Sequence, residues 1–287
     1  MSDSGTMNLD RLREWIGREE TRTDLATAVP YAALSATLDR DDAESANGTE
    51  VPPLWHWLYF LPMAPMSDVG PDGHPKRGGF LPPVPLPRRM FAGGRFEFHH
   101  PLKIGERMSR TSRITDVSSK EGRSGKLVFV TVRHEIANAG GLALGEEHDI
   151  AYRENPRADA PASKPVPAPA GETFSREIVP DPVLLFRYSA LTFNSHRIHY
   201  DRPYVTEVEG YPGLIVHGPL IATLLVDLLR RNLPQANVHH FSFRVYALCS
   251  IFTALPFAAD GMGIGSRYGH AIMRDGSRWK RVPISPE

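Results

Sequence analysis

The chain has 287 residues, of which 41% are hydrophobic, and its 33 basic side chains balance 33 acidic ones. A chain of this length forms one large domain or two ordinary ones, and its balanced charge gives no support for nucleic acid or an anionic membrane as a partner. No run approaches the ~20 apolar residues of a membrane span. The single cysteine excludes an internal disulfide framework and suits a reducing compartment. We therefore expect a soluble, cytoplasmic protein.

The first half of the chain combines helical segments with strands. Helices are predicted at Asn8–Ile16 and Pro30–Thr37, and the aromatic run Leu54–Leu61 predicts a short buried element before a proline- and glycine-rich loop over 62–95. The strands expected after this loop are Arg95–Phe98, Arg107–Val117, Lys126–Asn138 and Leu142–Tyr152. In the third of these, valines recur at every second residue, which is the period of a strand. An antiparallel meander is therefore predicted to follow the helical region.

A change of composition then divides the chain. Residues 154–170, ENPRADAPASKPVPAPA, are rich in proline and alanine and have no apolar periodicity. Such a composition favours an extended linker. We predict an N-terminal domain over 1–153 and a C-terminal domain over 171–287.

The second half repeats the order of helices and strands. Asp181 followed by proline predicts a capped helix over Val183–Leu191. The segment Pro219–Leu233 is apolar nearly all round, which is typical of a buried helix. The strands expected around these helices are Thr173–Ile178, Val238–Ser250, Leu255–Phe257 with the segment after it, Ser266–Met273 and Trp279–Val282. Both halves therefore predict the α+β class.

The segment 193–218 carries the chemistry. It opens on a polar cluster and closes on an apolar run that leads to His217 and Gly218 at the start of the buried helix. The members of the cluster are Asn194, His196, His199 and Asp201. A helix start offers unpaired N–H groups to a polarised carbonyl, and an imidazole can accept and donate protons near neutral pH. These are the groups needed for proton transfer at the carbons next to a carbonyl.

This segment resembles the active-site segment of the MaoC-like, R-specific enoyl-CoA hydratases, which have the hotdog fold. Here His199 matches the family's catalytic histidine, Asp201 the aspartate that follows it, and Ile215–Gly218 the closing Ile-x-His-Gly motif. Asn194 stands where the family has a catalytic aspartate. The amino-acid sequence of this segment is similar to that of the type 2 hydroxyacyl-thioester dehydratases and of the mesaconyl- and itaconyl-CoA hydratases. Their N-terminal half also resembles residues 78–87 and 126–135 here.

The resemblance implies a tandem (double) hotdog fold, in which each unit is a curved antiparallel sheet around a central helix. The two units are expected to pair in the manner of a homodimer. The C-terminal unit would carry the one active site, and the N-terminal unit would accommodate the substrate without catalytic residues. The resemblance is also compatible with a homodimer, in which two such double-hotdog subunits associate.

The reaction implied is the reversible addition of water to an α,β-unsaturated acyl-CoA by a hydro-lyase. The substrate is the CoA thioester itself, with no redox cofactor or metal. A branched C5 dicarboxylic acyl group is one expectation, and its free carboxylate would need a cation. Arg88, Arg89 and Arg187 are candidates among which the sequence does not choose.

The resemblance makes His199 the general acid/base, and the roles of its neighbours stay open. Asn194 either orients water and the thioester carbonyl or caps the preceding helix through a left-handed conformation. Asp201 orients His199, acts as the second acid/base, or only caps a turn. His196 is a weaker substitute for the missing aspartate.

At the helix start, the backbone N–H of Gly218 is expected to polarise the thioester carbonyl, and His217 to serve as a structural hydrogen-bonding partner. Arg197 and Arg202 are candidates for the CoA phosphates. A zinc site built from the three histidines matches no standard spacing, so no metal is expected.

Three other functions remain open from the sequence. The chain could be a 3-hydroxyacyl-thioester dehydratase of fatty-acid metabolism, a hotdog thioesterase, or, because of Asn194, a catalytically inactive acyl-CoA-binding protein. The loop 78–89 is either the wall of a substrate tunnel or a rigid packing element. The acyl group, the choice between CoA and an acyl carrier protein, and the physiological direction are not determined.

Overall fold

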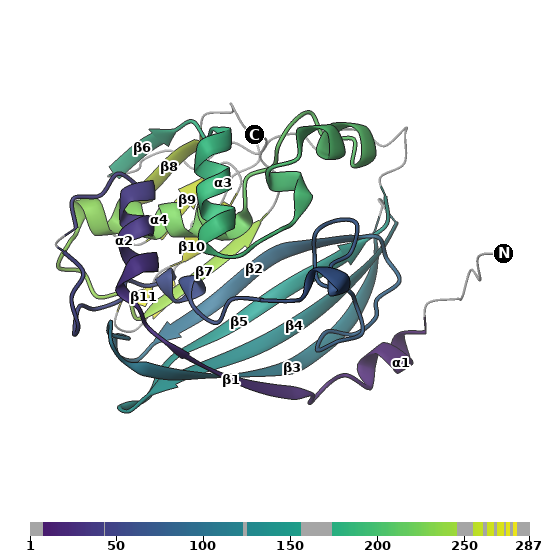
Figure 1. Cartoon of the computed structure of the whole chain (residues 1–287), viewed down its shortest axis with the longest axis horizontal. Coiled ribbons are helices and arrows are strands. Elements are labelled where there is room, and N and C mark those ends of the chain that lie inside the picture. The colour runs from purple at the N-terminus through teal and green to yellow at the C-terminus, as the bar shows by residue number, and fades with distance from the viewer. Residues whose placement is uncertain are drawn as a thin grey trace.

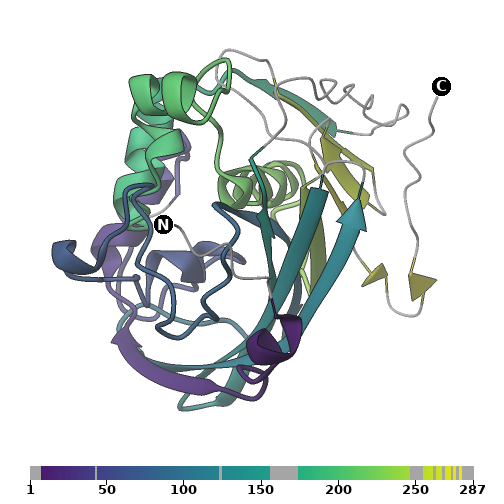
Figure 2. The same cartoon turned by 90° about the vertical axis from the view of Figure 1, so that its right-hand side faces the viewer.

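The computed structural model describes residues 8–42, 44–122, 125–155 and 174–245, and the backbone of short strands between 255 and 279. Ten strands form one antiparallel sheet in the order β1-β3-β4-β5-β2-β7-β10-β9-β8-β6. Figures 1 and 2 show that the sheet curves around helices α2, α3 and α4, which lie on one face of it. The α+β class predicted from the sequence is therefore confirmed.

The first five strands are the meander predicted from the sequence, with one strand added at its edge. They are β1 (Glu19–Leu25), β2 (Arg88–Phe98), β3 (Arg107–Gly122), β4 (Gly125–Asn138) and β5 (Gly141–Arg153). The edge strand β1 was not predicted because EETRTDL is mostly charged and exposed, as edge strands often are. The loop prediction for 62–95 was wrong at its end, since β2 begins at Arg88.

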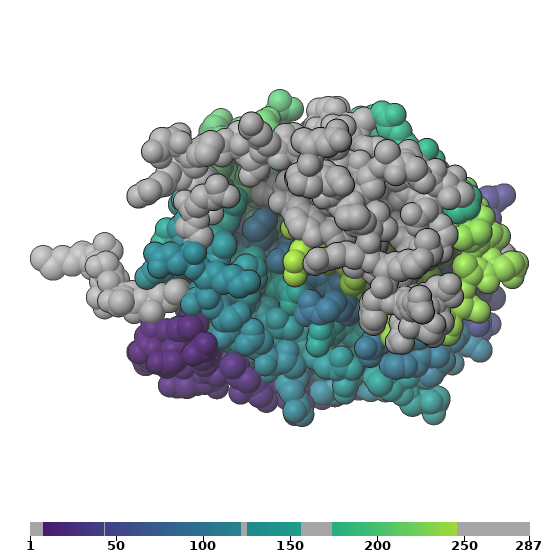
Figure 3. Space-filling model, turned by 180° about the vertical axis from the view of Figure 1, so that it is seen from behind, coloured from purple at the N-terminus to yellow at the C-terminus, as the bar shows by residue number. Residues whose placement is uncertain are grey.

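Helical elements of the first half lie close to their predicted places. They are α1 (Leu9–Arg13), α2 (Ala28–Thr37), and two short 3₁₀ turns, η1 (Trp55–Leu58) and η2 (Met66–Asp68). Helix α1 packs on β3, and the rear view shows it in purple at one end of the teal strands (Figure 3). Helix α2 instead leaves its own sheet and packs on α3 and η1.

The second half follows the predicted order. Its strands are β6 (Phe174–Ile178), β7 (His240–Val245), β8 (Leu255–Asp260), β9 (Gly263–Ser266) and β10 (Gly269–Ile272), and its helical elements are α3 (Pro182–Leu191), η3 (Arg197–His199), η4 (Tyr204–Val208) and α4 (Gly218–Asn232). A separate pair is formed by β11 (Arg274–Asp275) and β12 (Arg278–Trp279). The strand predicted at Ser266–Met273 corresponds to β10, which pairs antiparallel with β9, a strand that ends at Ser266.

Some predictions fall outside the described residues. These are most of the linker over 154–170, the end of the strand predicted at Val238–Ser250 together with Cys249, and the end of the strand predicted at Trp279–Val282. Among the described helices, none has the length and apolar character needed to cross a membrane.

The two halves of the sheet have the same order of strands. Numbered by their own chain order, the first five strands and the last five both lie as 1-3-4-5-2, and they meet through their second strands, β2 and β7. Apart from α1, which precedes β1, the helices of each half come between its first and second strands in the sequence. The two halves therefore share one strand order, which agrees with the repeated order of helices and strands predicted from the sequence.

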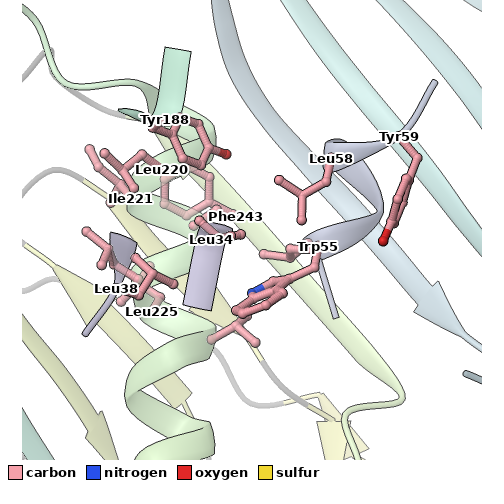
Figure 4. Close-up of a cluster of buried hydrophobic side chains, with 14 of the residues drawn as sticks. Leu34, Leu38, Trp55, Leu58, Tyr59, Tyr188, Leu220, Ile221, Leu225 and Phe243 are labelled. Carbon is pink, nitrogen blue, oxygen red and sulfur yellow. The ribbon is translucent and has the colours of Figure 1, made fainter. Parts of the chain in front are cut away.

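Helix α4 is the centre of the main core. Every residue from Leu220 to Leu229 is buried, and Figure 4 shows its leucines packed against Leu34, Trp55 and Tyr188 from three other elements. Asp227, on the same helix, is fully buried and forms ion pairs with three arginines: Arg40 at 2.6 Å, Arg176 at 3.1 Å and Arg231 at 2.7 Å. These contacts fix α4 to the chain after α2 and to β6.

A second core lies at the far end of the first-half sheet. Val84 and Leu86, from the loop before β2, pack there against valines and isoleucine of β3 and β4 and against Leu12 of α1. This part of the loop 78–89 is therefore a packing element, as one of its two predicted roles required.

Glycine is required where the two halves meet. At the seam, Gly93 of β2 lies opposite Arg244 of β7, and a Cβ on Gly93 would overlap the carbonyl oxygen of Phe243. The register of β2 against β5 also shifts between Phe91 and Gly93, as in a β-bulge. The missing side chain allows the two backbones to pair.

We predict that Gly93→Ala destabilises the protein by about 1–3 kcal/mol, because the added methyl group forces the seam apart. Urea unfolding measures the free energy change. Gly79→Ala is the matched control, since a Cβ there meets no atom within 4 Å, and it should change stability by less than about 0.5 kcal/mol. Equal stability of the two variants would contradict this account of the seam.

Candidate active site

The site is built around two stacked imidazoles at the start of α4. His217 is the N-cap of α4, and His199 lies in η3. Their ring centroids are 3.6 Å apart with an interplanar angle of 19°, and only 6% of His199 and 1% of His217 is exposed. The polar cluster and the closing motif of the segment 193–218 therefore meet in space.

Hydrogen bonds fix the orientation of both rings. His199 Nδ1 lies 2.7 Å from the Ile215 carbonyl oxygen. A carbonyl can only accept, so Nδ1 carries the proton and Nε2 keeps a lone pair. His217 Nε2 lies 2.8 Å from Ser189 Oγ of α3, and Tyr188 packs edge-on against the His217 ring. His199 is thus presented as a base.

Burial keeps these histidines neutral. Burial lowers the pKa of His199 to about 4, although its bond to Ile215 acts in the opposite direction. Burial and the neighbouring His199 hold the pKa of His217 well below its usual range. At neutral pH His199 is therefore unprotonated and ready to accept a proton.

The row of imidazoles continues into the first half of the chain. The His196 ring lies 5.3 Å from that of His199 and 4.0 Å from that of His74. His74 Nδ1 is in turn 3.1 Å from the Asp72 carboxylate. Although burial alone would raise it, the hydrogen bond and charge of His74 lower the pKa of Asp72 to about 2.

Asp72 and His74 were not predicted from the sequence. Pro71-Asp72-Gly73 is a recognisable turn, but nothing in its spacing links it to residues 195–197. In the structure the Arg197 N–H donates to the Asp72 carbonyl oxygen, and a Cβ on Gly73 would overlap the Ser195 carbonyl. Gly73, with a φ of +88°, allows this close approach of the two loops.

Asn194 and Asp201 do not contact His199. The positive φ at the end of α3 falls on Phe193, at 50°, so the alternative of a left-handed Asn194 was wrong. Asn194 Oδ1 instead accepts the His196 N–H at 3.0 Å. Asp201 accepts from Arg197, at 2.7 Å, and from the Tyr204 N–H, which is the turn-capping geometry.

The two arginines proposed for the CoA phosphates lie in different surroundings. Arg197 is held by Asp201, donates to the Pro71 carbonyl, and stacks on the Tyr204 ring at 4.1 Å. Arg202 is exposed. Arg197 therefore clamps the two loops together, whereas Arg202 keeps its guanidinium available at the surface.

Gly218 lies at the start of α4, as predicted, under a tight apolar cover. A Cβ on Gly218 would lie 2.9 Å from Phe91 Cδ1 and 3.2 Å from Val245 Cγ2. Phe91 is on β2 and Val245 on β7, the two strands of the seam. The first N–H groups of a helix have no intrahelical acceptor, so this start can polarise a carbonyl.

A second buried polar cluster lies behind Phe91. The Phe91 ring contacts His148 at 4.7 Å. Beside it, Glu146 bonds His56 at 3.0 Å and accepts from Trp57 Nε1 at 3.2 Å. These contacts hold η1 on β5 and satisfy a carboxylate that is only 3% exposed.

A pocket opens beside the histidine row. It encloses about 350 Å³, including its open mouth, and its lining includes Arg88, Arg89, Arg153, Asp72, His196 and Ile198. Residues 87–90, at the end of the proline-rich loop, form one wall of this pocket.

Within the described part of the chain, one group of three side chains could hold a metal: Asp72, His74 and His196, whose ligand atoms lie within 4.8 Å of one another. His74 Nδ1 is already engaged with Asp72. After burial, the charge of Arg89 is the largest influence lowering the pKa of His74, to about 4. The same charge opposes a cation, so the donor set fits a metal poorly.

Comparisons with known proteins place this geometry in one family. The family model described as "Hydroxyacyl-thioester dehydratase type 2" matches residues 54–251. The mesaconyl-C(4)-CoA hydratase of Chloroflexus aurantiacus is 52% identical over 244 residues, which cover 85% of this chain and 86% of that protein.

Solved structures show the same fold at low identity. A MaoC-like dehydratase of Phytophthora capsici has a TM-score of 0.64 at 14% identity, over 94% of this chain and all of that one. A conserved Mycobacterium tuberculosis protein with a double hotdog fold has a TM-score of 0.56 at 14% identity, over 95% and 99% of the two chains. The fold is therefore an α+β hotdog fold.

The neutral histidines make stability depend on pH. An unfolded histidine binds a proton near pH 6.5, whereas His199 and His74 do so only near pH 4 in the folded protein. Between these values the unfolded chain binds more protons, so stability falls as pH falls. We predict that the urea midpoint decreases from pH 7 to pH 4.5. His199→Gln should lessen the slope, and a midpoint independent of pH would contradict the burial argument.

Proposed function

Because the chain belongs to the type 2 hydroxyacyl-thioester dehydratase family, we propose that it adds water reversibly to an α,β-unsaturated acyl-CoA with His199 as its acid/base. It is a hydro-lyase of the enoyl-CoA hydratase type. The observation that carries the proposal is the buried, neutral His199, whose Nδ1–H is fixed by the Ile215 carbonyl at 2.7 Å next to the start of α4.

The thioester carbonyl is proposed to lie at the Gly218 N–H. In this position the helix start stabilises negative charge on the carbonyl oxygen as an enolate forms. The absence of a side chain at Gly218 makes room for Phe91 and Val245, which exclude water from this side of the helix start. Exclusion of water strengthens the electrostatic stabilisation.

One imidazole is sufficient for the proton transfers. His199 Nε2 takes a proton from water as the oxygen bonds to the β-carbon, and the resulting imidazolium returns a proton to the α-carbon. Both new bonds form on one face of the double bond in a syn addition, so a single base can serve both steps. This route accounts for activity with asparagine at position 194, since Asn194 and Asp201 then have no proton to move.

Neighbouring histidines have positioning roles in this proposal. His217 stacks on His199 and is fixed by Ser189, so the His199 ring has one orientation. A charged His217 would repel the imidazolium that forms during the reaction, and its burial prevents this. His196 keeps the edge of the site polar.

We further propose that the two five-strand halves are two hotdog units in tandem. Their common 1-3-4-5-2 order supports this, and the site lies in the second unit. The first unit supplies the seam residue Phe91 and the loop with Asp72 and His74. Helix α2 of the first unit packs on α3 of the second, and in this proposal the first unit accommodates the acyl group.

For the substrate we propose a branched C5 dicarboxylic acyl-CoA such as mesaconyl-CoA. The 52% identity to a mesaconyl-C(4)-CoA hydratase supports this choice. Hydration would give citramalyl-CoA. A 3-hydroxyacyl-thioester dehydratase is the same chemistry in reverse on another acyl group, and the family description favours it as the second candidate.

We predict that the enoyl-thioester absorbance falls when the protein is mixed with mesaconyl-C4-CoA, without release of free thiol. His199→Ala should lower kcat/KM by about 100- to 10,000-fold, the usual contribution of a general acid/base. The exposed His99 gives a matched control, and His99→Ala should retain full activity.

Other outcomes separate the alternatives. Thiol release would show a thioesterase. Tight binding of mesaconyl- and crotonyl-CoA with no turnover would show an inactive binding protein. Full activity of His199→Ala would refute the proposed role of this residue.

A further inference from the structure

The pocket beside the histidine row carries excess positive charge. Its lining contains three arginines, Arg88, Arg89 and Arg153, and two carboxylates, Asp72 and Glu209. Arg88 and Arg153 lie directly opposite each other on β2 and β5, a repulsive arrangement unless something compensates it. A pocket of this charge is suited to an anion.

Arg88 is already neutralised. Its Nε lies 3.2 Å from the Glu209 carboxylate, and it donates to Asn155 at 3.0 Å and to the Tyr211 hydroxyl at 2.8 Å. Arg153 donates to the same hydroxyl, at 2.8 Å. These bonds hold Arg88 in place and leave it little capacity for a ligand.

Arg89 is different, because no described carboxylate lies at ion-pair distance from it, although its charge acts on the nearby Tyr152 hydroxyl and helps to lower the pKa of Asp72. Glu209 pairs with Arg88, and Asp72 pairs with His74 at 3.1 Å. Arg89 is half-buried and lines the pocket together with His196. The positive charge of Arg89 also acts on the neighbouring histidines, because it adds to burial in lowering the pKa of His74.

We propose that Arg89 binds the free carboxylate of a dicarboxylic acyl group and thereby selects this class of substrate. The inference rests on the proposed hydratase function. A guanidinium presents a planar fork of N–H donors that matches a carboxylate in a bidentate pair. Arg153, across the pocket, adds a second positive charge.

The position of the pocket fits the chemistry of such a substrate. In mesaconyl-C4-CoA the free carboxylate is attached to the β-carbon, to which water adds. The anion site must therefore adjoin the acid/base, and this pocket is lined by Ile198, which precedes His199 directly, and by His196, three residues before it. The CoA phosphates are separated from the thioester by the whole pantetheine arm, so they belong farther away.

Arg187, the third candidate from the sequence, fits this role poorly. It lies on α3 with an exposed side chain and is outside the pocket lining. An exposed guanidinium keeps its water shell and contributes little to selectivity. The structure therefore favours Arg89 over both Arg88 and Arg187.

The test compares mesaconyl-C4-CoA with crotonyl-CoA, which has no second carboxylate. Arg89→Gln should lower kcat/KM for mesaconyl-C4-CoA by about 10- to 150-fold, the value of a lost charged hydrogen bond, and change that for crotonyl-CoA less than twofold. The kcat/KM of Arg89→Lys for mesaconyl-C4-CoA should lie between the values of the wild-type protein and of Arg89→Gln. Arg113→Gln, an exposed arginine on β3, is the matched control and should change neither value.

Calorimetric binding of both thioesters and of free CoA gives a readout that does not need turnover. If Arg89→Gln lost affinity equally for both thioesters, or lost affinity for free CoA, Arg89 would contact the CoA phosphates and the proposal would be overturned. Selective loss in Arg187→Gln, or no loss in Arg89→Gln, would also overturn it. A further outcome is that Arg89→Gln binds mesaconyl-C4-CoA more weakly than the wild-type protein does, while the wild-type protein hydrates neither thioester. In that case the carboxylate site stands and the hydratase function fails.

Discussion

The close approach of β2 to β7 at Gly93 is the constraint on which the rest of the structure depends. Because a side chain at Gly93 would overlap the Phe243 carbonyl, glycine at this position lets the two five-strand halves pair closely as one sheet. The same seam carries Phe91 and Val245 over the start of α4 and places Arg89 beside His196. A site with residues from both halves is a consequence of this junction.

Burial then decides the chemistry. His199 and His217 stack within 3.6 Å in a nearly sealed core, where neither is stable as an imidazolium at neutral pH. His199 donates its Nδ1–H to the Ile215 carbonyl, which leaves its Nε2 as the basic atom, and His217 is fixed by Ser189. The arrangement leaves one neutral imidazole with a free Nε2, and on this group the proposed mechanism with Asn194 in place of the family's aspartate depends.

Features encoded by neighbouring residues were predictable from the sequence. Asp181 and Pro182 specify the start of α3, and the Asp181 side chain accepts the Leu184 N–H as expected. The apolar run after Gly218 specifies a buried helix, and alternating valines specify β4. These elements depend on local spacing and capping, which a sequence displays directly.

Features that depend on distant contacts were not predictable. The turn at Asp72–His74 meets residues 195–197 more than a hundred positions later, and no local signal marks this contact. The choice of Arg89 over its neighbour Arg88 depends on Glu209 and Tyr211, which reach Arg88 only after the halves have joined.

The central claim is that one imidazole, His199, adds water across one face of an enoyl thioester. Hydration of mesaconyl-C4-CoA in deuterium oxide, followed by nuclear magnetic resonance of the product, tests it most directly. The account predicts one deuterium at the α-carbon on the same face as the new hydroxyl group. Deuterium on the opposite face, or thiol release without a new C–D bond, would contradict it.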